Sequence, residues 1–110
     1  MKTSEMTGSA LDWSVAKCWY GEDYDMSIPL FDDGLIFAPS TNWAHGGPII
    51  ERESISIERK HDGWWMASCK YHYADDPMYL VLGDTPLIAA MRCYVASKLG
   101  DNITIPEALQ

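Results

Sequence analysis

Several residues that could hold a ligand lie next to a glycine pair. Trp43 precedes Gly46 and Gly47, and Pro48 follows them. If a helix begins at Pro48, its first backbone N–H groups are free, and the two glycines let an anion such as a phosphate approach them. Asn42 adds a polar side chain beside this otherwise apolar run. A tight turn into a helix, without a binding role, is the alternative interpretation of the same segment.

Two residues elsewhere in the chain could complete such a site. Trp64 and Trp65 are neighbours on an alternating segment, so their rings point to opposite faces of a strand, and at least one ring is expected to be exposed or to line a groove. An exposed indole can stack on a nucleobase or anchor a protein partner. Arg92 lies on an apolar helix, where its guanidinium could meet a phosphate or pair with Asp84. The candidate ligand-binding residues are therefore Asn42, Trp43, Gly46, Gly47, Trp64 and Arg92.

The sequence contains little that indicates catalysis or a metal site. Cys69 and His72 are three residues apart on a predicted strand, so their side chains point to opposite faces and do not share a metal ion. The acidic pairs Asp32-Asp33 and Asp75-Asp76 adjoin predicted turns, where such residues are common. The sequence has no glycine-rich phosphate loop and no nucleophile motif. We therefore expect a protein that is not an enzyme and that carries no metal and no cofactor.

Composition narrows the function classes further. The 110 residues include 8 Lys and Arg against 16 Asp and Glu, which gives a formal net charge of −8. Nucleic-acid binders present clustered basic residues, so direct binding of nucleic acid is not expected. No run reaches the roughly 18 apolar residues of a membrane span. The chain has an odd number of cysteines, and they are widely spaced: Cys18, Cys69 and Cys93. This pattern favours free thiols in a cytoplasmic protein over a set of disulfides.

Helical periodicity is clearest at the two ends of the chain. A first helix is predicted over residues 9–20, with Ser9 and Asp12 as a capping box. A last helix is predicted from Pro86, capped by Thr85, to the residue before a glycine at position 100. Between them, Pro48 predicts a short helix that ends at Glu53, and one bent helix across residues 39–53 is the alternative.

The remaining apolar segments predict strands. Residues 27–31 and 35–38 flank an Asp-Asp-Gly turn and predict one hairpin. Residues 54–60 and 64–73 alternate in polarity and predict a second hairpin, to which residues 78–82 could add a strand. The order α-ββ-α-ββ(β)-α predicts an α+β fold, with a four- to five-stranded, mostly antiparallel sheet and helices packed on one face. We expect a single domain over residues 1–110, with an ordered core at about 7–100 and a short C-terminal tail at 101–110.

Four segments carry a resemblance to a known family: residues 11–17, 38–53, 62–67 and 84–100. In these segments the chain resembles the NinX-like group of small phage and prophage proteins. The match covers most of residues 7–100 and departs in loops 21–34 and 70–83. The resemblance implies a bacteriophage accessory protein made in the bacterial cytoplasm, and it implies no catalytic or binding residues.

Accessory phage proteins of this size commonly bind a component of the host, and three hypotheses follow. The first is that the protein counters or modulates a host system by sequestering a small nucleotide-like ligand in a pocket lined by aromatic and glycine residues. The second is an acidic protein–protein interaction module, which inhibits a host protein, in one form as a nucleic-acid mimic. A small hydrolase is less favoured, because no cluster of polar groups converges in the sequence. A homo-oligomer formed through an exposed aromatic face is a further expectation.

Overall fold

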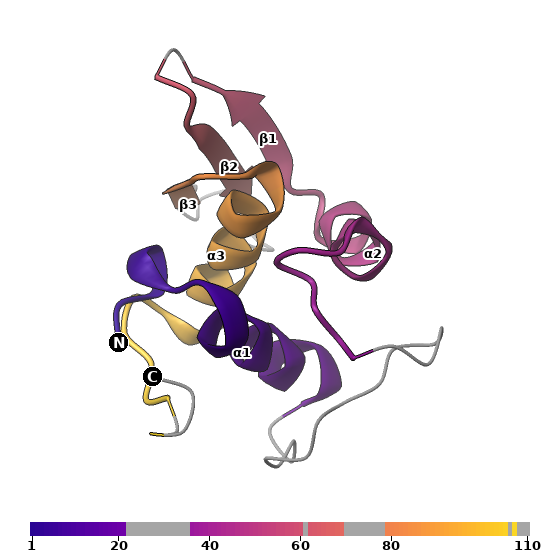
Figure 1. The fold of residues 1–110 in the computed structure, drawn as a ribbon, viewed down its shortest axis with the longest axis vertical. Coiled ribbons are helices and arrows are strands. Elements are labelled where there is room, and N and C mark those ends of the chain that lie inside the picture. Colours follow the sequence, from indigo (N-terminus) through magenta and orange to yellow (C-terminus); the bar gives the residue numbers. More distant parts are fainter. Residues whose placement is uncertain (22–35, 61, 70–78, 106, 108–110) are drawn as a thin grey trace, which may run out of the picture.

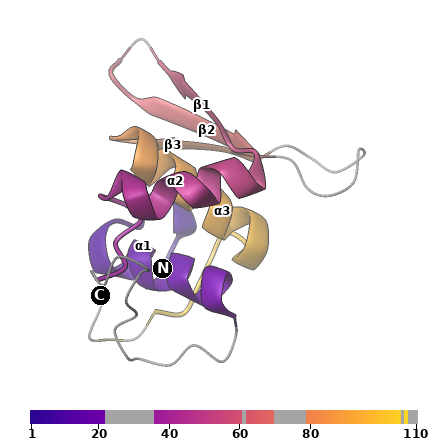
Figure 2. The same cartoon turned by 90° about the vertical axis from the view of Figure 1, so that its right-hand side faces the viewer.

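The computed structural model describes residues 1–21, 36–60, 62–69, 79–105 and 107. Within these residues, seven elements follow one another: the short 3-10 helix η1 (Thr3–Glu5), α1 (Gly8–Tyr20), α2 (Trp43–Glu53), β1 (Ser56–Arg59), β2 (Trp65–Cys69), β3 (Tyr79–Gly83) and α3 (Pro86–Leu99). Figures 1 and 2 show the strands as one layer, with α3 between this sheet and α1, and with α2 beside α3. The helices therefore lie on one face of the sheet, as predicted.

The sheet is antiparallel, with strand order β1-β2-β3. Its hairpin pairs Arg59 with Trp65, and Gly63 in the connecting turn has a φ of 82°, a conformation that glycine adopts at little cost. The predicted hairpin is thus confirmed over 56–69, and the additional strand is present as β3. Residues 70–73 of the predicted hairpin lie outside the described residues. The prediction of four or five strands is not confirmed, because the described residues form a sheet of three. The predicted hairpin over 27–38 lies mostly outside the described residues.

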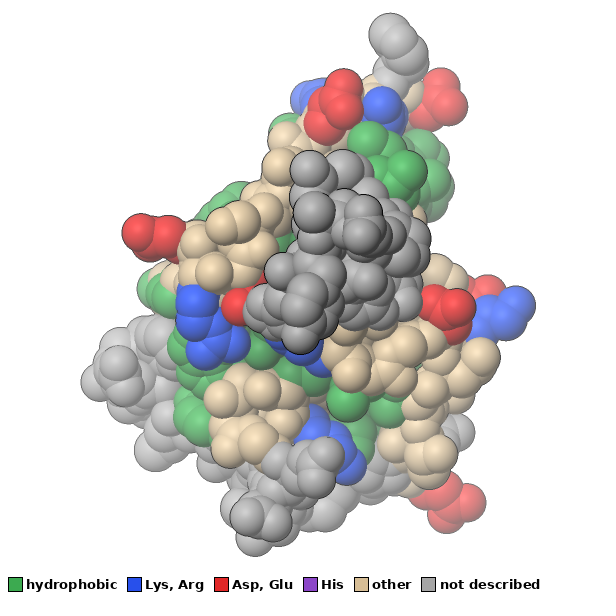
Figure 3. All heavy atoms as spheres, turned by 180° about the vertical axis from the view of Figure 1, so that it is seen from behind, with side chains coloured by type: hydrophobic (Ala, Val, Ile, Leu, Met, Phe, Trp, Pro, Cys, Tyr) green, Lys and Arg blue, Asp and Glu red, His purple; other side chains and the backbone are tan. Residues whose placement is uncertain are grey.

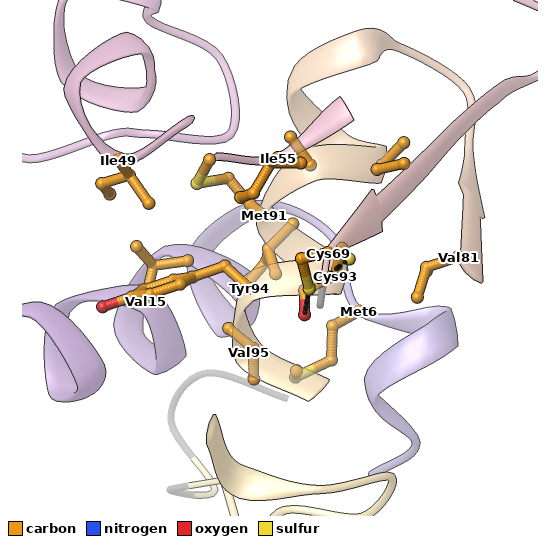
Figure 4. Close-up of a cluster of buried hydrophobic side chains, with 14 of the residues drawn as sticks. Met6, Val15, Ile49, Ile55, Cys69, Val81, Met91, Cys93, Tyr94 and Val95 are labelled. Atoms are coloured by element: carbon orange, nitrogen blue, oxygen red, sulfur yellow. Dashed lines mark hydrogen bonds between the residues drawn. The ribbon is translucent and has the colours of Figure 1, made fainter. Parts of the chain in front are cut away.

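The hydrophobic core surrounds α3 (Figure 4). This helix is buried on almost every side, because the sheet covers one side of it and α1 and α2 cover others. Side chains from each layer meet there: Met6, Val15, Ile49, Ile55, Cys69, Val81, Met91, Tyr94 and Val95. Thr85 caps α3 by accepting a hydrogen bond from the N–H of Ile88 at 3.1 Å, as the sequence predicts.

The first helix starts one residue earlier than predicted and lacks the predicted capping box. Its N-cap is Thr7, and Ser9 lies inside the first turn. Asp12 instead accepts a hydrogen bond from the backbone N–H of Ser40 at 2.9 Å. The carboxylate thus satisfies a backbone donor of the segment that leads into α2, and this tertiary bond replaces the local one that the sequence pattern suggested.

The predicted helix start at Pro48 is wrong. The helix α2 begins at Trp43 and runs through Gly46, Gly47 and Pro48, which makes the alternative of one long helix nearly correct. Its true cap is Asn42, whose Oδ1 accepts a hydrogen bond from the N–H of Ala44 at 2.9 Å. The N–H groups of the first turn have partners, because Ala44 donates to the Asn42 side chain and both His45 and Gly46 donate to the Asn42 carbonyl oxygen. Pro48 therefore marks no free helix N-terminus.

The first residues of the chain pack against the segment at 101–103. The backbones of Lys2 and Asn102 form an isolated antiparallel β-bridge, and the N–H of Thr3 donates to the carbonyl oxygen of Asp101 at 2.9 Å. Met6 and Ile105 are both buried in the core, so the packed region extends beyond residues 7–100 at both ends. In the part of the chain that the structure describes, no helix has both the length and the apolar character needed to cross a membrane.

Candidate functional site

A hollow of about 710 Å³ lies beside β3, the last strand of the sheet order. Residues of η1, β3 and α3 and the segment at 101–102 line it, and we call it the β3 hollow. Two of the six candidate residues, Trp64 and Arg92, line it together. Its volume is within the range of about 300–1,000 Å³ that is usual for small-molecule sites.

Arg92 is the buried cation of the β3 hollow, with 8% of its surface exposed. Its Nε donates to the carbonyl oxygen of Met6 at 2.8 Å, and its Nη1 donates to the carbonyl oxygen of Leu82 at 2.9 Å. Burial lowers the pKa of the Arg92 guanidinium, and the nearby carboxylates of Asp84 and Glu5 partly offset this effect. A guanidinium nevertheless stays protonated in proteins.

The predicted alternative, an ion pair between Arg92 and Asp84, is not formed. Among the described residues no carboxylate lies within ion-pair distance of Arg92, whereas Arg52 does pair with Glu53 at 3.2 Å. The two hydrogen bonds of Arg92 use Nε and Nη1. Its Nη2 has no hydrogen-bond partner in the described part of the chain and is therefore available to a ligand in the β3 hollow.

Trp64 borders the β3 hollow and is 43% exposed. Trp65, the next residue, packs against the core, which confirms that the two rings point to opposite faces. The strand register places Leu82 opposite Met66, and both Leu82 and Leu80 are exposed. Trp64 thus lies at the end of an apolar strip on the outer side of the sheet, and it lines the same hollow as Arg92.

The other four candidate residues lie away from the β3 hollow, on or next to α2. Asn42 is the helix cap, and Trp43 is 55% exposed on the first turn. Gly46 is buried, and a Cβ there would lie 2.6 Å from both Leu87 Cδ2 and the carbonyl oxygen of Pro39. A Cβ at Gly47 would meet no atom within 4 Å. The structure therefore divides the candidate residues between two places and does not unite them in one pocket.

The sequence analysis missed the residues that the chain ends contribute. Lys2 and Glu5 line the β3 hollow, as do Asp101 and Asn102 from the other end of the chain. Lys2 pairs with Asn102, a residue at almost the other end of the sequence. Such a contact leaves no local pattern in the sequence from which it could be predicted. The apolar residues of the tail, Ile103 among them, were the one indication that this segment packs against the domain.

The described acidic and basic side chains do not gather into one region on the face turned away from the viewer of Figure 1. Figure 3 shows acidic and basic side chains dispersed among the described atoms of that face. Within the described residues there is also no group of three or more His, Cys, Asp and Glu side chains that could hold a metal ion. The arrangement at the β3 hollow can bind a ligand by stacking, by hydrogen bonds and by one buried positive charge.

Comparison with known proteins identifies the family. A search of curated proteins found no match to the chain. The family described as "Bacteriophage P22, NinX" matches residues 2–98, which include Trp64, Arg92 and all but the last residue of α3. Because this match covers far more than half of the 110 residues, the chain belongs to the bacteriophage P22 NinX family.

Proposed function

We propose that this phage accessory protein acts by binding and not by catalysis, and that the β3 hollow takes a small nucleotide-like ligand in the host cytoplasm. The observation that carries the proposal is the free Nη2 of a buried Arg92 in a hollow bordered by an exposed Trp64. Nη2 is not one of the buried side-chain atoms that lack a partner, so solvent reaches it. An anionic ligand can take the place of that water and form a charge-assisted hydrogen bond.

The remaining lining residues fit the other parts of a nucleotide. The ring of Trp64 offers a stacking surface for a base. The carboxylates of Glu5 and Asp84 can accept hydrogen bonds from the amino groups of a base, while Lys2 supplies a second positive charge for a phosphate. The net charge of −8 opposes an anion at long range, so the proposal depends on these contacts at short range.

Isothermal titration calorimetry tests the proposal with GMP and AMP, and with guanosine and adenosine as matched probes that lack the phosphate. We expect at least one monophosphate to bind more tightly than its nucleoside. Trp64→Ala should weaken binding by about 1–3 kcal/mol, the usual contribution of one stacked base. Trp43→Ala is the control, because it removes an exposed indole outside the β3 hollow.

Two results would contradict the proposal. One is the absence of measurable binding by both monophosphates and both nucleosides. The other is an equal loss of affinity in Trp43→Ala and Trp64→Ala, which would show that the β3 hollow has no special part in binding.

The apolar strip formed by Trp64, Leu80 and Leu82 favours a second candidate function. Together with the net charge of −8, this exposed strip suits a host protein with a basic rim around an apolar centre. A second copy of the chain is another occupant of the same strip. Light scattering after size-exclusion chromatography distinguishes these, because Leu82→Glu should convert a homo-oligomer to a monomer and leave a monomer unchanged.

A further inference from the structure

Two of the three cysteines meet inside the core. Cys69 is the last residue of β2, and Cys93 lies in the middle of α3. Their Sγ atoms are 2.9 Å apart, and Figure 4 shows the two side chains pointing toward each other. A disulfide has a sulfur–sulfur distance of about 2.05 Å, so the two sulfurs need to approach by less than about 1 Å to bond.

We propose that Cys69 and Cys93 form a redox-active pair that a hydroperoxide converts into an intramolecular disulfide between β2 and α3. The elements already hold the two sulfurs together, and no rearrangement of the fold is needed to bring them within reach. Neither cysteine lines the β3 hollow, so this reactivity and ligand binding are tested separately.

Cys69 is the sulfur that reacts first. The pKa of Cys69 is lowered to about 7, mainly by the hydrogen bond that it shares with the Cys93 thiol, while burial acts in the opposite direction and Ser97 makes a smaller lowering contribution. The charges of Lys98 and Glu53 act on it in opposite directions. The same sulfur–sulfur hydrogen bond raises the pKa of Cys93. Cys69 is also 5% exposed and Cys93 fully buried, so an oxidant reaches Cys69 more readily.

The reaction has two steps. The thiolate of Cys69 attacks one oxygen of the hydroperoxide, the O–O bond breaks, and a sulfenic acid forms as the other oxygen leaves as an alcohol or water. The sulfur of Cys93 then attacks the sulfur of Cys69 and displaces hydroxide, which takes the proton of the Cys93 thiol and leaves as water. The two thiols lose two electrons and two protons, and the hydroperoxide is reduced by the same two electrons.

Cys18 serves as an internal control. It is only partly buried, it lies on α1, and burial raises its pKa to about 11. A thiol with a raised pKa is a poor nucleophile at neutral pH, because the thiolate is the reactive form. Cys18 should therefore stay reduced while the pair oxidises, although it is more exposed than either member of the pair.

The experiment treats the reduced, desalted protein with an equimolar amount of hydrogen peroxide and counts free thiols under denaturing conditions. We expect the count to fall from three to one, and a non-reducing peptide map to join the peptides of Cys69 and Cys93. The Tm should rise by about 10 °C, because the cross-link restricts the unfolded chain, and dithiothreitol should reverse both changes. In the Cys18→Ser variant, the same treatment should lower the thiol count from two to none.

Three outcomes would overturn the proposal. In the first, all three thiols survive a treatment that oxidises free cysteine completely. In the second, Cys18 is consumed before the pair. In the third, Cys69 is overoxidised to a sulfinic acid with Cys93 still reduced, which would show that the second sulfur does not reach the first.

Discussion

The guanidinium of Arg92 donates from Nε to the carbonyl oxygen of Met6, a residue 86 positions away in the sequence, at 2.8 Å. Its Nη1 donates to the carbonyl oxygen of Leu82 in β3. One side chain thus fastens both the N-terminal segment and the last strand to α3. These three elements surround the β3 hollow, so Arg92 shapes the hollow as well as offering it a charge.

Replacing Arg92 should lower stability. Arg92→Met keeps much of the apolar stem but leaves the carbonyl oxygens of Met6 and Leu82 without their donor. We expect the free energy of unfolding to fall by about 2–4 kcal/mol, measured by urea denaturation. Arg92→Lys should lower the free energy of unfolding by less than Arg92→Met, because an ammonium group can still donate to one of the two carbonyl oxygens. A change below about 0.5 kcal/mol in Arg92→Met, the usual limit for surface positions, would contradict this role.

The paired tryptophans allow a matched test of the sheet faces. Trp65 packs against the core, and the guanidinium of Arg59 lies 5.7 Å from its ring centroid. Because Trp65 is half-buried, Trp65→Ala should cost about 2–3 kcal/mol, somewhat less than a fully buried aromatic. Trp64→Ala should cost less than about 1 kcal/mol, because its ring is exposed. If chemical denaturation shows that Trp64→Ala is the more destabilising of the two variants, the assignment of the Trp65 face to the core is wrong.

The sequence predicted these faces because alternation is a local property of a strand. It also predicted α3, since Thr85 and Pro86 mark a helix start and the apolar residues repeat at helical spacing. It failed at Pro48, because the close packing of Gly46 against Leu87 favours a continuous α2, and no local rule contains that contact. The contacts between the chain ends were missed for the same reason.

The candidate site shows the same division. Strand alternation predicts that one of Trp64 and Trp65 is exposed, and Arg92 is an unusual charge on an apolar helix; the structure brings Trp64 and Arg92 to one hollow. Trp43, Gly46 and Gly47 are candidates only if a helix begins at Pro48. Since α2 begins at Trp43, Pro48 lies inside the helix and provides no free helix N-terminus for an anion.

The two glycines of α2 should respond to alanine in opposite directions. A Cβ at Gly46 would lie 2.6 Å from the backbone oxygen of Pro39, which cannot move aside easily, so Gly46→Ala should cost about 1–3 kcal/mol. A Cβ at Gly47 meets no atom within 4 Å, and alanine suits a helix interior better, so Gly47→Ala should add about 0.5–1 kcal/mol. Thermal unfolding measures both. Destabilisation by Gly47→Ala would indicate that the helix is interrupted there.

The difference in stability between the wild-type protein and an Asp12→Asn variant should depend on pH. Burial raises its pKa above 3.8 in the folded state, against the opposing hydrogen bond from Ser40. Protonated Asp12 is therefore favoured by folding, so this group's contribution to stability decreases as the pH rises through its unfolded and folded pKa values. The free energy of unfolding of the uncharged Asp12→Asn variant should therefore rise relative to that of the wild-type protein as the pH increases from about 3 to about 7. Urea denaturation at several pH values checks this, and a difference that moves the other way would contradict the sign.

Asp12→Ala separates the charge from the hydrogen bond. Asn can still accept from the N–H of Ser40, whereas Ala cannot. We expect Asp12→Ala to be about 1–2 kcal/mol less stable than Asp12→Asn at neutral pH. Equal stability of the two variants would show that the bond between α1 and the segment before α2 contributes nothing.

The most direct test of the ligand proposal is a ¹H–¹⁵N NMR titration of the protein with GMP, observing the indole N–H signals of its five tryptophans and the Nε–H signal of Arg92. The spectra of Trp64→Ala and Trp43→Ala assign the two indole signals that matter. The account predicts saturable shifts at Trp64 and Arg92, with the Trp43 signal unchanged. Shifts confined to Trp43, or no shift at either Trp64 or Arg92, would contradict it.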